Sequence, residues 1–315
     1  MTNTFKEDVR KGLEQPLKTL PSKYFYDKKG DALFVEIMNL PEYYLTRCEL
    51  EIFQNKTNAL IEALQLKTNS HFELIELGAG DGLKTKHLLK ALIDQHFNFE
   101  YIPIDISANA LQLLQKDLNK TLPNVAVTPK QGDYFEVLAS LKHNNKPKVI
   151  LFLGSNIGNM DDVIAQQFIY NLSANLQKND MLLLGVDLIK SEDIVLPAYN
   201  DSKGITAQFN LNILERINNE LEANFNLDNF EHLPKYDAVK GIAESYILST
   251  KAQTVSIKAM NATFDFDEGE KIHTEISRKY NDKLIHSVIA NTDFTIEDKI
   301  LDSKAYFADY ILKRH

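Results

Sequence analysis

The chain has 315 residues, of which 44% are hydrophobic and 25% charged, as in an ordinary globular protein of one or two domains. Its net charge of −9, without a cluster of Lys and Arg, argues against a nucleic-acid partner. A single cysteine, Cys48, excludes an intramolecular disulfide framework, and no apolar stretch is long enough to span a membrane. The N-terminal residues lack the apolar core of a signal peptide, so we predict a cytoplasmic protein, and we expect a monomer without a membrane partner.

The predicted elements begin with an apolar strand over 72–77, which leads into a glycine-rich turn and a helix over 84–95. Further strands are predicted at 101–105, 125–127, 148–154 and 181–188. Ser107 is placed to cap a helix that buries Leu111, Leu114 and Leu118, and a helix from about Asp161 is expected to bury Ile164, Phe168 and Leu172. Continuous apolar strands that alternate with amphipathic helices predict an α/β fold with a parallel sheet covered on both faces.

After Lys190 the pattern changes to a polar, helix-prone region and then to alternating segments around 244–258 and 261–267, which predict antiparallel strands. A final hairpin is predicted from 293–301 and 305–312. A parallel sheet extended by such a hairpin is the seven-strand arrangement of many methyltransferases. We therefore expect a cofactor-binding domain from 48–189 plus 280–315, and a substrate-binding lobe from 1–47 plus 190–279.

The turn Gly78-Ala-Gly80-Asp-Gly82 lets a ligand approach the backbone, because glycine has no Cβ. Its spacing differs from the Gly-x-Gly-x-x-Gly of dinucleotide sites. Glu76 and Asp81 would repel a diphosphate, but they suit a cofactor with an amino group and a sulfonium. The turn therefore favours S-adenosylmethionine, although a plain structural turn and a dehydrogenase site remain alternatives on this evidence alone.

Acidic residues follow two further strands. Asp105 is placed to hold the hydroxyls of a cofactor ribose, and its structural alternative is a turn or capping aspartate. Asp133 and Tyr134 are placed to meet an adenine amino group and ring, although Gly-Asp is also common in surface turns.

The loop 154–159 follows the fourth strand, at the sheet edge where open α/β sheets bind ligands. Asn159 can exchange hydrogen bonds with a zwitterionic substrate, or it can cap the next helix. Ser155 has the wrong spacing for a nucleophile elbow. The eight histidines show no metal-ligand spacing, so we predict no metal site.

Ordered segments along nearly the whole chain carry a family resemblance. They lie at 20–27, 40–47, 76–85, 152–159, 183–190, 198–212, 252–255 and 274–280. Together they resemble the histidine-specific Nα-methyltransferase family of ergothioneine biosynthesis. The resemblance implies a Rossmann-like class I fold that depends on S-adenosylmethionine, with a second lobe for substrate. The implied reaction methylates the α-amino group of L-histidine up to three times and yields hercynine.

The same resemblance implies the site residues. Tyr26 would lie beside the reacting amine and would orient it together with Tyr43, as the catalytic residues. Tyr43, Asn159 and Tyr199 would hold the amino-acid head. Glu275 and Ser277 would hold the imidazole edge. The implied cofactor-binding residues are Glu76, Gly78, Gly80, Lys84, Asp105, Asp133 and Tyr134.

Two features depart from the family. Ser245 stands near the substrate where relatives have a methionine, and the tryptophan-rich C-terminal block is missing. The first leaves open a same-family enzyme that methylates another amino acid, such as a tryptophan derivative, or the imidazole ring. A catalytically idle cofactor-binding protein is the alternative from another class. Glu275 and Ser277 favour histidine, because a carboxylate facing an indole lacks one of its partners.

Overall fold

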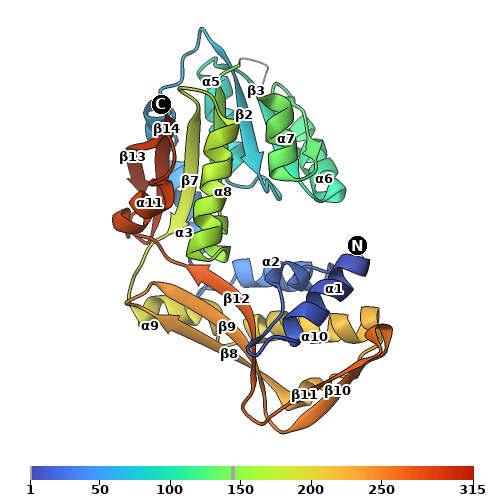
Figure 1. Cartoon of the computed structure of the whole chain (residues 1–315). Helices are drawn as coiled ribbons and strands as arrows, with labels where there is room; N and C mark the ends of the chain where they lie inside the picture. The colour runs from blue at the N-terminus through green and yellow to red at the C-terminus, as the bar shows by residue number, and fades with distance from the viewer. Residues whose placement is uncertain (1, 143–145) are drawn as a thin grey trace. The chain divides into compact units, whose positions relative to one another are not determined.

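The computed structural model describes residues 2–142 and 146–315, and it divides into two compact units (Figure 1). Unit 1 consists of Met1–Tyr44 and Lys190–Arg278, and unit 2 consists of Leu45–Ile189 and Lys279–His315. Each unit has a hydrophobic core of its own. That these units are the expected substrate-binding and cofactor-binding domains stays a prediction.

Unit 2 is built on one sheet in the order β13-β14-β7-β6-β2-β3-β4, with β5 also paired to β3. The pairs among β2 to β7 are parallel, whereas β14 runs antiparallel to β7 and to β13. This order confirms the predicted Rossmann-like methyltransferase sheet. The strands are β2 (His71–Leu77), β3 (Asn98–Asp105), β4 (Ala126–Val127), β5 (Lys130–Gln131), β6 (Lys148–Phe152), β7 (Met181–Asp187), β13 (Phe294–Leu301) and β14 (Phe307–Arg314).

Helices cover both faces of this sheet. α7 (Tyr134–Leu141), α8 (Asp162–Asn175) and α11 (Asp282–Ile289) pack with Ile75, Ile150 and Leu184 in one core. On the other side α3 (Leu45–Asn55) and α4 (Thr57–Ala63) contact the terminal hairpin, and α5 (Thr85–Asp94) packs on both of them. α6 (Ala108–Thr121) lies against β3.

Side-chain caps explain where these helices begin. Ser107 accepts a hydrogen bond from the N–H of Ala110, as predicted, and its helix buries Leu111, Leu114 and Leu118. The predicted inward stripe of α8 was wrong at one position. Asp161 caps this helix by accepting from the N–H of Ile164, and Ile164 is 55% exposed. Ala165 and Ile169 are buried instead, together with Phe168 and Leu172, so the buried stripe is displaced around the helix from the predicted one.

Unit 1 holds a four-stranded sheet in the order β1-β12-β9-β8. The pairs β12–β9 and β9–β8 are antiparallel, as is the separate pair β10–β11, which agrees with the alternation seen in the sequence. Its strands are β1 (Lys18–Thr19), β8 (Phe230–Asp237), β9 (Ile242–Ser249), β10 (Gln253–Ile257), β11 (Ala262–Phe266) and β12 (Lys271–Arg278).

The core of unit 1 lies between this sheet and its helices. α10 (Ile205–Leu221) packs on α2 (Lys28–Met38) and on β8 and β9, and buries Phe209, Ile213 and Ile217. α1 (Thr2–Leu13) adds Phe5, Val9 and Leu13 to the same core. Short helical turns complete the unit: η1 (Ser22–Phe25), α9 (Glu192–Val195), η3 (Leu196–Tyr199), η4 (Leu227–Asn229) and η5 (Lys258–Met260).

Candidate active site

The glycine turn after β2 has the backbone that the sequence predicted. Gly78, Gly80 and Gly82 have φ values of 72°, 55° and 65°, in the left-handed region where residues with a Cβ are disfavoured. A Cβ on Gly78 would lie 2.8 Å from the hydroxyl oxygen of Tyr134, whereas a Cβ on Gly80 would meet nothing within 4 Å. The turn therefore presents bare backbone, which fits the close approach of a nucleoside cofactor.

The structure brings the predicted adenosine-binding residues to this turn. Asp105 ends β3, and its Oδ1 accepts from the N–H of Ser107 at 2.9 Å. Asp133 caps α7 by accepting from two backbone N–H groups, a role that the sequence analysis did not predict for it. Burial, followed by the charges of Asp105 and Asp133, raises the pKa of Tyr134 to about 12. Tyr134 thus keeps its proton and presents a hydroxyl beside Gly78.

The carboxylate of Glu76, at the end of β2, is buried and hydrogen-bonded within the protein, and its role at the cofactor stays a prediction. The residue is 3% exposed, and its oxygens accept from the hydroxyls of Thr85 and Tyr101. Burial raises the pKa of Glu76 to about 7, against the opposing effect of these two hydrogen bonds and of Lys84. Glu76 therefore ties the start of α5 to β2 and β3 beneath the glycine turn.

Lys84, just before α5, forms an ion pair with Glu49 of α3, which the sequence analysis missed. Both carboxylate oxygens of Glu49 also lie 2.9 Å from the backbone N of Gly154. Burial opposes the charge on Lys84, but Glu49 and then other carboxyl groups raise its pKa, so it stays protonated. A signal for Glu49 was present: it lies among the residues that α3 buries, at helical spacing from Leu45 and Ile52.

The loop after β6 presents Asn159 at its end. Asn159 closes the turn η2 (Asn156–Asn159) and is exposed, while Asp161 rather than Asn159 caps α8, so the capping alternative is wrong. Ser155 has a φ of 56° and is buried, and its Oγ accepts from the N–H of Asp187 at 3.0 Å. This use of Ser155 agrees with its exclusion as a nucleophile.

Unit 1 brings the residues predicted for the imidazole edge together with Tyr199, which was predicted to hold the amino-acid head. Tyr199 donates its hydroxyl proton to Ser277 Oγ at 2.7 Å, and Ser245 Oγ lies 3.2 Å from Glu275 Oε2. Ser245 and Glu275 face each other across the β9–β12 pair, with the register shifted between His273 and Glu275. Glu275 and Ser277 therefore lie two positions apart on β12, with Ser245 opposite Glu275 on β9 and the Tyr199 hydroxyl bonded to Ser277.

Tyr26 and Tyr43 belong to an aromatic cluster in the same unit. The ring of Phe34 lies edge-on to both, with centroids 5.4 Å from Tyr26 and 6.3 Å from Tyr43. Although 44% of the Tyr26 surface is exposed, desolvation of its hydroxyl, followed by the charge of Glu275, raises the pKa of Tyr26. Tyr26 is therefore electrostatically linked to the Glu275 site and holds its proton at neutral pH.

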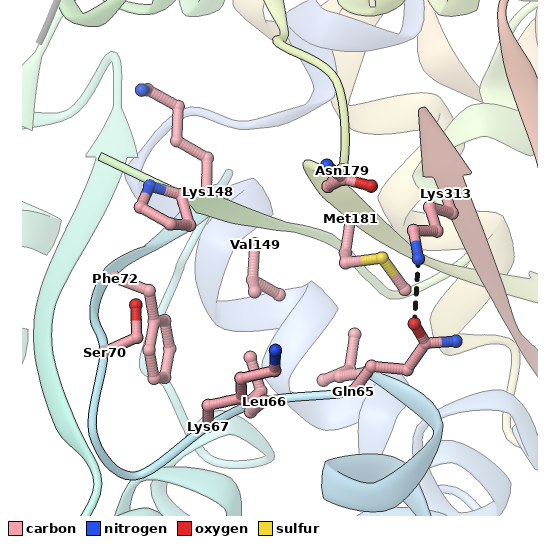
Figure 2. Close-up of a pocket in the computed structure, with 12 residues that line it drawn as sticks. Gln65, Leu66, Lys67, Ser70, Phe72, Lys148, Val149, Asn179, Met181 and Lys313 are labelled. Atoms are coloured by element: carbon pink, nitrogen blue, oxygen red, sulfur yellow. Dashed lines mark hydrogen bonds between the residues drawn. The ribbon is translucent and has the colours of Figure 1, made fainter. Parts of the chain in front are cut away.

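A distinct hollow of about 400 Å³ lies at the amino ends of β2, β6 and β7, and Figure 2 shows Phe72, Val149 and Met181 in its wall. The glycine turn and the 154–159 loop follow the carboxyl ends of β2 and β6, at the opposite edge of the sheet. This hollow is therefore not the predicted cofactor site. Among the residues that the structure describes, no three His, Cys, Asp or Glu side chains gather as a metal site, and no helix could cross a membrane.

Comparison with known proteins identifies the family. Residues 5–314 match the family described as "Histidine-specific methyltransferase, SAM-dependent". The chain belongs to this family. Its cofactor is therefore S-adenosylmethionine, as the glycine turn predicted.

Three relatives place the chain within that family. It is 36% identical over 285 residues to "Histidine N-alpha-methyltransferase" of Mycolicibacterium smegmatis, covering 90% of this chain and 87% of the relative. It is 31% identical over 311 residues to "Ergothioneine biosynthesis protein 1" of Schizosaccharomyces pombe, covering 96% of this chain and 40% of that longer protein. Identity falls to 25% over 325 residues with the "L-tryptophan methyltransferase" of Psilocybe serbica, covering 95% and 90%. The chain is thus more similar in sequence to the first two relatives than to the tryptophan methyltransferase.

Proposed function

We propose that this enzyme transfers methyl groups from S-adenosylmethionine to the α-amino group of L-histidine, up to three times, to give hercynine. The observation that carries the choice of substrate is the polar cluster of Ser245, Glu275, Ser277 and Tyr199 in unit 1. Family membership and the identity to histidine methyltransferases support the same choice.

The cluster suits the two nitrogens of an imidazole. Glu275 can accept from one ring N–H, and the hydroxyl of Ser277 can complement the other nitrogen in either tautomer. Tyr199 donates to Ser277 Oγ, and this hydrogen bond fixes the position of the Ser277 hydroxyl group beside Glu275. An indole has a single N–H, so it would leave part of this cluster without a partner.

The reacting amine must be neutral and aligned with the methyl group. When bound, S-adenosylmethionine supplies an electrophilic methyl group on a sulfonium, whose positive charge favours the neutral amine. We propose that Tyr26 and Tyr43 orient this amine and that positioning supplies much of the rate. Tyr43, Asn159 and Tyr199 would hold the amino-acid head of the substrate. Because the pKa of Tyr26 is raised, it serves as a neutral hydroxyl rather than a base at neutral pH, and we propose that protons leave through water.

In unit 2, we propose that the cofactor site is formed by Glu76, Gly78, Gly80, Lys84, Asp105, Asp133 and Tyr134. The bare backbone at Gly80 and the hydroxyl of Tyr134 beside Gly78 support this assignment. The monomeric state and the cytoplasmic location stay predictions.

The deciding experiment is incubation of the purified enzyme with S-adenosylmethionine and each amino acid, followed by mass spectrometry. We expect histidine to gain one, two and three methyl groups, with fragmentation placing them on the α-nitrogen. Methylation of tryptophan alone, or of the imidazole ring, would overturn the proposal. A Tyr26→Phe enzyme with unchanged rate and methylation pattern would overturn the role given to Tyr26.

A further inference from the structure

A buried acidic pair lies on the face of the unit 2 sheet that α3 covers. Glu49 of α3 and Asp309 of β14 are both 0% exposed. Asp309 is the register partner of Gly185 on β7. A Cβ on Gly185 would lie 2.1 Å from Glu49 Oε1 and 3.0 Å from Asp309 Oδ1. The missing side chain of Gly185 therefore makes the space in which the two carboxyl groups meet.

Glu49 joins two loops that follow the carboxyl ends of neighbouring strands. Lys84 follows the glycine turn after β2, and Gly154 begins the loop after β6. Glu49 pairs with the Lys84 ammonium and accepts from the N–H of Gly154. A single buried carboxylate thus fixes the distance between the glycine turn and the 154–159 loop.

Asp309 is suited to support this carboxylate as a neutral acid. Among the residues that the structure describes, neither of its side-chain oxygens has a hydrogen-bond partner. Burial and then the charge of Glu49 raise the pKa of Asp309 well above its usual range, and Lys84 only partly offsets them. A protonated Asp309 carries a hydroxyl that can turn toward Glu49 Oε1, while the charge of Glu49 is balanced by Lys84.

We infer that Glu49 and Asp309 are positioning residues for the cofactor, which act by holding Lys84 and Gly154 in place without touching the cofactor themselves. The inference rests on the proposed binding of S-adenosylmethionine at the glycine turn. The space at Gly185 is part of the same arrangement, because any larger residue would displace Glu49.

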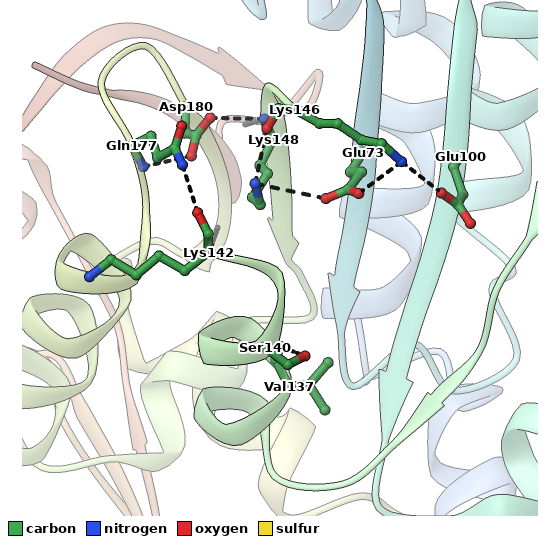
Figure 3. Close-up of polar contacts among 9 residues, drawn as sticks. All are labelled: Glu73, Glu100, Val137, Ser140, Lys142, Lys146, Lys148, Gln177 and Asp180. Carbon is green, nitrogen blue, oxygen red and sulfur yellow. Dashed lines mark hydrogen bonds and ion pairs between the residues drawn. The ribbon is translucent and has the colours of Figure 1, made fainter. Parts of the chain in front are cut away.

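The first test measures the Kd of S-adenosylhomocysteine by isothermal titration calorimetry in Glu49→Gln. We expect roughly tenfold weaker binding or more, because the amide loses the charge that pairs with Lys84 and turns one acceptor into a donor. The matched control is Glu73→Gln, which removes another buried carboxylate of unit 2. Glu73 pairs with Lys146 at the amino end of β2 (Figure 3), so its loss should leave the Kd of S-adenosylhomocysteine unchanged.

The second test substitutes Gly185, which perturbs the position of the Glu49 carboxylate without removing its charge. Gly185→Ala should weaken binding in the wild-type enzyme, because its methyl group needs the position of Glu49 Oε1. In a Glu49→Ala background the methyl group has room, so adding Gly185→Ala should change the Kd much less. Circular dichroism checks that each variant is folded.

At Asp309, Leu should weaken binding more than Asn, because only the amide can donate a hydrogen bond to Glu49. The inference is wrong if Glu49→Gln and Glu73→Gln have the same Kd as wild type, or if the effect of Gly185→Ala is the same in both backgrounds. A wild-type enzyme that binds no S-adenosylhomocysteine would instead defeat the proposed function, so the two failures are distinguishable.

Discussion

Replacement of Glu76 by Gln tests whether a buried carboxyl group beneath the glycine turn holds a proton near neutral pH. Burial raises the pKa of Glu76 from its ordinary value of 4.5 to about 7. The folded chain therefore binds a proton that the unfolded chain has already lost between these two values. Because the folded state binds more protons in this window, the free energy of unfolding must fall as pH rises.

The size of the effect follows from the width of the window. A shift of the Glu76 pKa from 4.5 to about 7, at about 1.4 kcal/mol per pH unit, corresponds to about 3 kcal/mol in the free energy of unfolding. Most of this stabilisation is lost between about pH 5 and pH 8. Gln has nearly the same shape and does not titrate, and it can still accept from Thr85 or Tyr101. Glu76→Gln should therefore lose about 2 to 3 kcal/mol less stability than wild type over this range.

The assay is urea unfolding of both proteins at several pH values, with the difference in the free energy of unfolding plotted against pH. Subtracting the two proteins cancels the other titrating groups that they share. Tyr101→Phe removes a hydrogen bond to the charged form of Glu76, so it should move the pH-dependent step to higher pH. Parallel curves for wild type and Glu76→Gln would refute the reasoning, since Glu76 would then have the same pKa in both states.

Two further predictions concern the glycine turn and unit 1. Gly78→Ala should weaken binding of S-adenosylhomocysteine about tenfold or more in calorimetry, because a positive φ and the hydroxyl of Tyr134 both oppose a Cβ; unchanged binding would contradict this. Burial lowers the pKa of His232, so its folded form favours the neutral ring and its contribution to stability should be lost as pH falls below about 6.5. His232→Gln should remove that part of the acid sensitivity in thermal unfolding, and an unchanged pH profile would speak against it.

The fold could be predicted because its signals are local. The apolar strands, the positive-φ glycines and the cap at Ser107 each depend on residues close in sequence. The hairpin at the C-terminus could be placed for the same reason, since Asp302 accepts backbone hydrogen bonds from residues just after it in the turn. The prediction that Ile164 is buried was wrong, because the buried face of α8 depends on how the helix is rotated against the sheet. The spacing of apolar residues alone does not determine that rotation.

For the candidate site, too, local features could be predicted from the sequence, whereas contacts between distant residues could not. The sequence identified Glu76 as acidic and next to the glycine turn, but only the structure shows that its carboxylate is used by Thr85 and Tyr101. Successive side chains of a strand point to opposite faces of the sheet. The side chain of a residue next to a ligand-binding loop, such as Glu76, can therefore point into the protein interior. Ser245 could be recognised as a departure from the family, yet its contact with Glu275 depends on the register of β9 and β12, which are far apart in sequence.

Gly185 shows why a glycine within a buried strand calls for an explanation. Glycine weakens a strand because it offers no side chain to pack, and Gly185 is not among the residues with a positive φ that would require it. The reason lies in another element: the carboxylate of Glu49 occupies the position where a Cβ would be. A small residue in an apolar strand and an acid on an apolar helix face are each unfavourable alone. They become compatible only when the fold places one against the other, and together they hold the two loops at the carboxyl edge of the sheet.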